Sequence, residues 1–139
     1  MDAIKNIIAG RGWFVISATR EELGAHDAPA NLAATRDLLR YLDEMELPFV
    51  PCDGIYRGVP QGRSFLVIAN GHVGRYLCRA FRQESILTAD GLVNGGGDLL
   101  AKRVGDRFGD EAEASDFYSV FGGGLRWSAD LEFPATADA

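Results

Sequence analysis

Arginines close to aromatic residues are the side chains in this sequence best suited to chemistry. They are Arg20, Arg57 after Tyr56, Arg82 after Phe81, and Arg126 before Trp127. A guanidinium group binds a phosphate through paired hydrogen bonds, and an aromatic face stacks on a nucleotide base. Residues of this kind that converge in the fold would form a nucleotide pocket, whereas each one alone is typical of a solvated surface arginine. The chain uses 12 arginines and 2 lysines, which suits diphosphate binding and is equally typical of a GC-rich coding sequence.

Residues for nucleophilic catalysis form no recognisable pattern. Ser17 and Ser64 lie in or beside predicted strands, without the Gly-X-Ser-X-Gly elbow that exposes a nucleophilic serine. His26 falls in a predicted loop and His72 at a predicted helix start, and the sequence places neither beside a nucleophile. We therefore predict no catalytic residues.

Metal and phosphate motifs are also weak. The acidic residues Asp106, Asp110, Glu111 and Glu113 lack EF-hand spacing and favour a solvated loop. Cys52 and Cys78 form no Cys-X-X-Cys pair and favour reduced, half-buried thiols. The stretch 94–98 (Asn-Gly-Gly-Gly-Asp) favours a flexible turn, although exposed amides in such a loop could bind an anion. We expect neither a metal nor a cofactor.

Composition indicates a soluble acidic domain. The chain has 139 residues, of which 47% are hydrophobic, and this is enough for one domain with a sizeable core. Its formal charge of −6 argues against general binding to DNA, RNA or an anionic membrane, because such binding needs an excess of basic residues. The sequence has no long apolar run typical of a membrane span. We expect a cytoplasmic protein with one domain over residues 1–133 and a flexible tail over 134–139.

The elements that position these residues are predicted as alternating strands and helices. Strands are predicted at residues 13–18, 49–59 with a bend at 53–54, 64–69, 85–88 and 92–93. The run 64–69 is almost continuously apolar, so we expect burial on both of its faces. Apolar residues at three- and four-residue steps predict a helix over 29–45, capped by Asp27, and another over 73–81. A turn is predicted at 60–62, and the stretch 99–108 fits a helix or a strand.

The C-terminal region predicts a β-hairpin, with strands 117–121 and 125–133 around three glycines. Along the second strand apolar and polar residues alternate, which indicates one buried and one wet face. The complete order predicts an α+β fold: an antiparallel or mixed β-sheet with two helices packed on one face, plus the C-terminal β-hairpin. A ferredoxin-like arrangement would satisfy this order.

Several short segments give the chain a resemblance to a known family. They are 13–20 (WFVISATR), Asn31 at a helix start, 54–59 (GIYRGV), 64–67 (SFLV) and 80–87 (AFRQESIL). This set resembles small phage and bacterial proteins, and most of all the phage Thoeris anti-defence sponges of the first type described. Members of that family bind the cyclic ADP-ribose isomer that host TIR-domain proteins make as an alarm signal. They hold it intact, so that the downstream effector is not triggered, and some also sequester cyclic oligonucleotides.

The resemblance covers roughly residues 13–93 and, more weakly, the final hairpin. It implies a non-enzymatic protein of the host bacterial cytoplasm, with a cyclic nucleotide as partner, that forms a homo-oligomer, either a dimer or a hexamer. By position, it implies that Arg20 and Arg57 face the phosphates, Phe81 stacks on the adenine, Asn94 bonds the base or ribose, and Arg126 pairs with the pyrophosphate. The glycine-rich and acidic stretch 95–115 departs from the family pattern and leaves the identity of the messenger open.

Two other classes of function stay open at the level of sequence. An enzyme acting on an ADP-ribosyl nucleotide would need a general base, for which Glu84, near Phe81, is the best candidate. A protein-interaction module would use the arginines and aromatics as a hot-spot patch, with Trp127 as its anchor.

Overall fold

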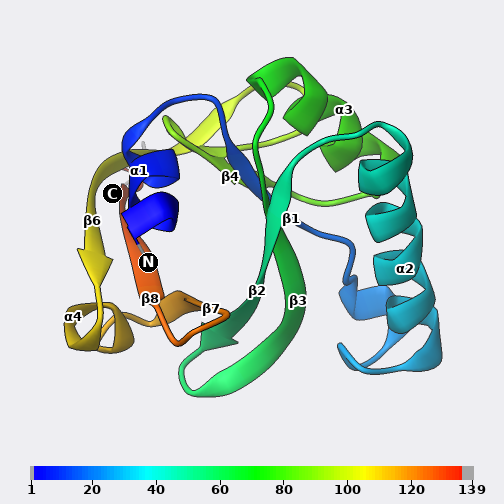
Figure 1. Cartoon of the computed structure of the whole chain (residues 1–139), viewed down its shortest axis with the longest axis horizontal. Helices are drawn as coiled ribbons and strands as arrows, with labels where there is room; N and C mark the ends of the chain where they lie inside the picture. The colour runs from blue at the N-terminus through cyan, green and yellow to red at the C-terminus, as the bar shows by residue number, and fades with distance from the viewer. Residues whose placement is uncertain (1, 136–139) are drawn as a thin grey trace.

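Eight antiparallel strands close into a barrel, which the computed structural model describes over residues 2–135 (Figure 1). The strands are β1 (Phe14–Ser17), β2 (Phe49–Tyr56), β3 (Val59–Val67), β4 (Ile86–Thr88), β5 (Gly91–Val93), β6 (Leu99–Phe108), β7 (Phe117–Phe121) and β8 (Arg126–Glu132). The helices are α1 (Asp2–Ala9), the 3₁₀ helix η1 (Glu21–Leu23), α2 (Pro29–Glu44), α3 (Gly71–Ala80) and α4 (Asp110–Glu113). Around the barrel the strand order is β1-β3-β2-β7-β8-β6-β5-β4.

The predicted antiparallel or mixed β-sheet with two helices packed on one face is wrong, because the antiparallel sheet closes on itself into a barrel. Strand β1 pairs with β3 on one side and with β4 on the other, so that Phe14 lies opposite both Val67 and Thr88. The stretch 99–108 is a strand that joins the β7–β8 hairpin to β5. Closure depends on pairings between distant segments, and local hydrophobic periodicity carries no information about them.

The outer wall of the barrel packs against α2 and α3. Phe14 and Ile16 of β1 and Phe65 of β3 form one buried cluster with Leu38 and Leu77 from the helices. Leu66, between Phe65 and Val67, belongs instead to the cluster inside the barrel. Because side chains alternate along a strand, residues 65–67 are buried on both faces, which confirms that part of the prediction.

Inside the barrel, the core is built on two tryptophans and capped by α1. The rings of Trp13 and Trp127 meet edge to face, with 5.5 Å between their centroids. Ile8 of α1 is buried in the same cluster, and α1 lies within the ring of strands in the view of Figure 1. This helix falls in the region 1–10, where we predicted no element.

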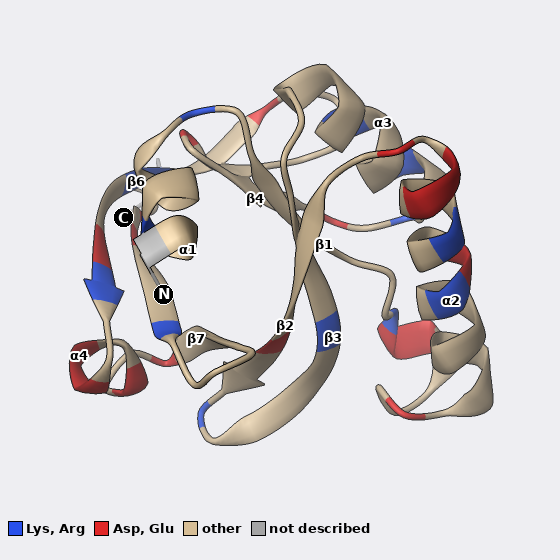
Figure 2. Cartoon of the chain, viewed as in Figure 1, with Lys and Arg blue, Asp and Glu red and all other residues tan. Residues whose placement is uncertain are grey.

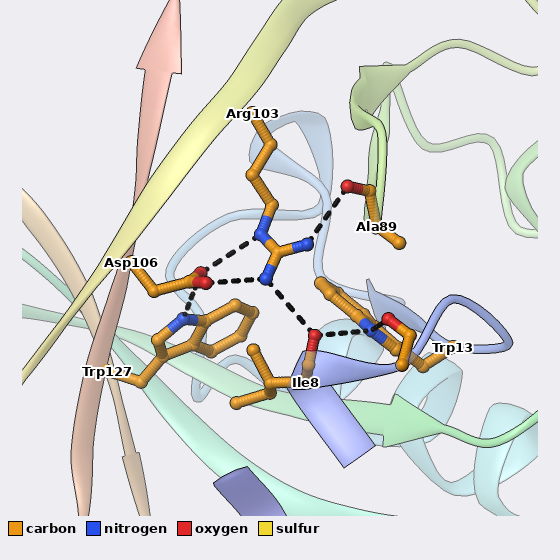
Figure 3. A network of polar contacts seen from close by, with 7 residues as sticks. Ile8, Trp13, Ala89, Arg103, Asp106 and Trp127 are labelled. Atoms are coloured by element: carbon orange, nitrogen blue, oxygen red, sulfur yellow. Dashed lines mark hydrogen bonds and ion pairs between the residues drawn. The ribbon is translucent and has the colours of Figure 1, made fainter. Parts of the chain in front are cut away.

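Arg103 of β6 ties α1 to the barrel wall (Figure 3). Its guanidinium binds the carboxylate of Asp106 through Nε (3.0 Å) and Nη2 (2.5 Å), and it donates to the carbonyl oxygens of Ile8 (3.1 Å) and Ala89 (3.0 Å). Trp127 Nε1 donates to Asp106 (2.9 Å), and Trp13 Nε1 donates to Ile8 O (3.2 Å). The Ile8 carbonyl lies in the last turn of α1, where helix carbonyls have no partner within the helix. Arg103 and Trp13 supply the missing donors. Asp106, predicted to lie in a solvated acidic run, belongs to this network.

Three local features, a turn, a bend and a helix cap, are compared with the prediction. The β2–β3 turn lies at Arg57–Gly58, both with positive φ (49° and 79°), and the predicted turn residues 60–62 belong to β3. The predicted bend in β2 is a register shift between Gly54 and Ile55. Asp27 does not cap α2, since the N-cap residue is Ala28 and makes no side-chain cap bond.

Two further expectations concerned the C-terminal tail and membrane spans. Of the predicted flexible tail over 134–139, residues 136–139 lie outside the described part of the chain. None of the helices within residues 2–135 is long and apolar enough to cross a membrane.

Candidate functional site: a polar cleft beside the 3₁₀ helix

Two adjoining hollows of about 520 Å³ each open beside η1, and together we call them the cleft. Both are lined by Thr19, Glu21, Gln61, Gln83 and Phe117. The His26 hollow adds Ser17, Gly24, His26, Gly54, Pro60 and Ser64, and the Arg82 hollow adds Arg20, Glu22, Arg82, Glu84 and Ser85. The Arg82 hollow has a mainly polar lining, whereas the lining of the His26 hollow is polar and apolar in nearly equal parts. Polar groups in such a lining can fix the orientation of a ligand.

Three segments that lie far apart in the sequence meet at this cleft: 17–26, 60–64 and 82–85. The β1–β3 ladder joins the first two, with Ser17 opposite Ser64. The Gln83 side chain joins the third, because its Nε2 donates to the carbonyl oxygen of Thr19 (3.3 Å). Sequence reasoning gave no site role to Gln61, which lies in the predicted turn 60–62, or to Gln83, which lies within the segment 80–87.

The buried side chain of Asn31 fixes the loop that forms one wall of the cleft. Its Oδ1 accepts the Arg20 N–H (2.8 Å), and its Nδ2 donates to the carbonyl oxygens of Arg20 (3.1 Å), Gly24 (3.1 Å) and Ala25 (2.8 Å). A buried amide is costly unless its polar atoms are bonded. The hydrogen bonds of Asn31 therefore fix the backbone of residues 20–25, which forms this wall of the cleft.

Gly62 allows this loop to approach β3 closely. Its φ is 100°, and a Cβ atom there would lie 3.1 Å from the Cβ of His26 and from Thr19 Oγ1. Thr19 Oγ1 is buried and has no hydrogen-bond partner within residues 2–135. An unpaired buried hydroxyl costs about 1–3 kcal/mol, so the cleft retains a polar group with unused hydrogen-bonding capacity.

The cleft carries charges of both signs. Arg20 is mostly buried and pairs with Glu22 at 3.5 Å. Arg82 is exposed and forms no ion pair with any carboxylate of the described residues. Glu21 and Glu84 also line the cleft. An anion that enters would therefore find two guanidinium groups among three carboxylates.

The two thiols lie in the cores, away from the cleft. Cys52 and Cys78 are free and buried. Burial and the neighbouring charge of Asp53 raise the pKa of the Cys52 thiol to about 12, against an opposing hydrogen bond from Ser119. Burial likewise raises the pKa of Cys78. Both are therefore neutral thiols near pH 7, and the thiolate is the reactive form of cysteine.

Arg20 and Phe81, two of the residues expected to bind the ligand, lie together. They line a third hollow of about 360 Å³, the Phe81 hollow, whose other lining residues are Ala18, Ala34, Asp37, Ala80 and Arg82. The Phe81 hollow adjoins the Arg82 hollow, because Arg20 and Arg82 line both.

Arg57 and Arg126, also expected to bind phosphates, pair instead with acidic residues of the chain. Arg57 lies at the exposed β2–β3 turn, 3.6 Å from Asp116. Arg126 of β8 pairs with Glu113 of α4 (2.5 Å), whose hydrogen bond raises the pKa of the guanidinium. Figure 2 shows α4 as an acidic segment. Neither arginine lines the cleft or the Phe81 hollow.

Asn94 organises its own loop. Its Oδ1 accepts the N–H groups of Gly96 (3.0 Å) and Asp98 (2.9 Å), and its carbonyl oxygen accepts the Gly97 N–H (3.0 Å). These three N–H groups donate to acceptors within the turn, so they are not free to bind an anion. Among the described residues, no group of three or more His, Cys, Asp and Glu is placed to hold a metal ion.

Trp127 cannot serve as the anchor of an interaction patch, as one alternative required. It is only 1% exposed, because β8 turns it into the barrel core. Glu84, the general base of the other alternative, does line the Arg82 hollow.

No protein-family model matches the chain, and no curated protein matches it.

Proposed function

We propose that this protein is a phage anti-defence sponge, which binds a cyclic nucleotide immune signal in the cleft and holds it intact. The signal is a cyclic ADP-ribose isomer or a related cyclic oligonucleotide, and its capture would block Thoeris-type immunity. One observation carries the proposal. Segments 13–20, 64–67 and 80–87, on which the family resemblance is based, all contribute residues to one cleft and its adjoining hollow.

The chemistry of these hollows suits a nucleotide. Pockets for small molecules span about 300–1,000 Å³, and hollows of about 520 and 360 Å³ adjoin here. Arg20 offers a guanidinium for phosphate, and Phe81 offers an aromatic face for a base. Gln61 offers an amide N–H and a carbonyl oxygen for ribose hydroxyls or base edges, and Gln83 offers its side-chain carbonyl oxygen, since its N–H groups donate to Thr19 O and Phe81 O.

A preformed wall favours retention of the ligand. The loop bound by Asn31 supplies one before any ligand arrives, which reduces the entropy lost on binding. Within the cleft, the Ser17 hydroxyl accepts the Thr19 N–H at 3.0 Å and so helps to hold this wall.

The proposal is tested by capture of the messenger. The purified protein is incubated with lysate from cells that express an active TIR-domain cyclase, repurified and heated, and the released molecules are identified by mass spectrometry. Release of an intact cyclic ADP-ribose isomer is expected. Conversion of the purified cyclic isomer to linear ADP-ribose by the protein would overturn the proposal in favour of an enzyme that uses Glu84. Retention of neither this isomer nor added cyclic oligonucleotides would overturn it altogether.

Variants locate the captured molecule. Arg20→Ala and Phe81→Ala are expected to lower retention at least about tenfold, because each removes a group from the shared hollow. Arg57→Ala and Arg126→Ala are the controls and are expected to retain the ligand, since neither arginine lines the cleft or the Phe81 hollow. Circular dichroism checks the fold of each variant. If only Arg57→Ala and Arg126→Ala lost the ligand, the binding site would lie at Arg57 and Arg126 instead of at the cleft.

We also propose that the chain assembles with itself as a dimer or hexamer, as the family resemblance implies. Light scattering after size exclusion gives the mass directly, to be compared with 15.1 kDa for one chain. A monomer at that mass across micromolar concentrations would contradict this proposal.

A further inference from the structure

Arg20 and Arg82 stand at the boundary between two different hollows. Both residues line the polar Arg82 hollow, and both line the Phe81 hollow. Besides the two arginines, polar and acidic side chains dominate the first hollow, among them Gln61, Gln83 and three glutamates. The second hollow adds Phe81, three alanines and the carboxylate of Asp37. A ligand that spans the boundary would therefore place its middle against two guanidinium groups.

The backbone presents Arg82 in a conformation that usually belongs to glycine. Arg82 follows α3 with φ of 53°. Its N–H donates to Arg79 O (3.1 Å), and the Gln83 N–H donates to Cys78 O (2.8 Å). This is a Schellman motif, in which glycine avoids the steric cost of a left-handed conformation.

Strain alone does not distinguish Arg82, because Glu46 ends α2 in the same way. Glu46 has φ of 55°, and the Leu47 N–H donates to Leu42 O (2.9 Å). Glu46, however, lines neither the cleft nor the Phe81 hollow. Two observations distinguish Arg82. It lies at the boundary between the two hollows, and its guanidinium forms no ion pair with a carboxylate of residues 2–135.

We propose that Arg82, together with Arg20, binds a phosphate group in the middle of the ligand. The ligand is then a phosphodiester or a diphosphate with an arm on each side, rather than a nucleotide with a terminal phosphate. A flat aromatic arm fits beside Phe81 and the alanines, and an arm rich in hydroxyls fits among the polar side chains of the Arg82 hollow. This inference deepens the proposed function and rests on it.

Calorimetry with defined probes tests the shape of the ligand. ADP-ribose carries a diphosphate between two arms, AMP carries a terminal phosphate on one arm, and inorganic pyrophosphate carries no arm. ADP-ribose is expected to bind at least about tenfold more tightly than either of the others, because only it occupies both hollows. Equal affinity for AMP and ADP-ribose would overturn the two-armed ligand.

A glycine substitution tests Arg82 itself without backbone strain. Arg82→Gly removes the guanidinium and suits the left-handed conformation, and it is expected to weaken ADP-ribose binding about tenfold or more. Glu46→Gly is the matched control, since it makes the same backbone change at the other helix end, and it is expected to leave affinity unchanged. Arg82→Lys keeps the charge and is expected to bind with intermediate affinity. Unchanged affinity in Arg82→Gly would overturn the assignment.

The two proposals fail in different ways. If the wild-type protein captures the cyclic messenger and Arg82→Gly captures as much, the inference fails while the proposed function stands. If the wild-type protein captures no messenger yet binds ADP-ribose in a manner that depends on Arg82, the proposed function fails and the inference stands. Binding of neither molecule overturns both.

Discussion

At the scale of single residues, Gly91 is the position where the barrel tolerates no side chain. It begins β5 with φ of 141°, and a Cβ atom there would lie 1.9 Å from the carbonyl oxygen of Ala101 and 2.9 Å from the Arg103 nitrogen. Neither neighbour can move without breaking the β5–β6 ladder, because both belong to backbone. Gly122, in the β7–β8 turn, has no atom within 4 Å of the equivalent position.

We expect Gly91→Ala to lower the free energy of unfolding by about 3 kcal/mol or more, through the clash and the unfavourable φ together. Gly122→Ala is the control and is expected to lie between neutral and about 1 kcal/mol stabilising, since it mainly restricts the unfolded chain. Urea unfolding followed by tryptophan fluorescence measures both. Similar midpoints for the two variants would contradict the close approach of β5 to β6.

At the scale of elements, the attachment of α1 depends on Arg103 more than on general ion pairing. The Arg103 and Asp106 side chains are 14% and 21% exposed, and the same guanidinium also holds two backbone carbonyls. Arg107, on the same strand, pairs with Asp130 at 2.8 Å, but their side chains are 48% and 35% exposed. The two arginines thus offer a comparison between a largely enclosed network and a surface pair.

Arg103→Ala is expected to cost about 3 kcal/mol of stability, because it leaves the Asp106 carboxylate and two carbonyls without their donor. Arg107→Ala is expected to cost less than about 1 kcal/mol, as exposed pairs do. Urea midpoints give the two costs. Limited proteolysis near the N-terminus reports whether α1 detaches in the first variant. Equal costs would mean that the network does not hold the helix.

How far the sequence predicted these elements depends on how regular each pattern is. The helix over 29–45 was correct to within a residue or so, because its apolar residues keep one helical face from Leu32 to Met45. The strand β6 was ambiguous because its register shifts between Arg103 and Gly105. That bulge lets Arg103 and Asp106, three residues apart, meet in one network, and so breaks the period of two.

Of the residues that the family resemblance placed in the site, only Arg20 and Phe81 lie together in the structure. Arg20 and Phe81 were expected in one pocket and share one hollow. Arg57, Asn94 and Arg126 were expected there as well, but spacing along the chain does not reveal the acidic partners and the turn that hold them elsewhere. Gln61 and Gln83 were missed because an amide side chain gives no charge signal in a sequence.

At the scale of the whole molecule, long-range electrostatics oppose the proposed ligand even though the local arginines favour it. The formal net charge is −6. The cleft itself adds Glu21, Glu22 and Glu84 to Arg20 and Arg82, so its own balance is one negative charge. A diphosphate that approaches from solvent is therefore repelled until it is close enough to contact the guanidinium groups. This situation differs from that of a protein with a basic patch, which attracts its anion from a distance.

The rate of association should consequently rise with salt. The Debye length falls from about 30 Å at 0.01 M to about 8 Å at 0.15 M ionic strength, so added salt removes the distant repulsion. Stopped-flow fluorescence with ADP-ribose is expected to give an association rate constant that increases a few-fold over this range. The dissociation rate constant should rise too, because salt also weakens the contacts with Arg20 and Arg82. An association rate that falls with salt would indicate attraction by a positive surface, and would move the entry point of the ligand away from a cleft bordered by three glutamates.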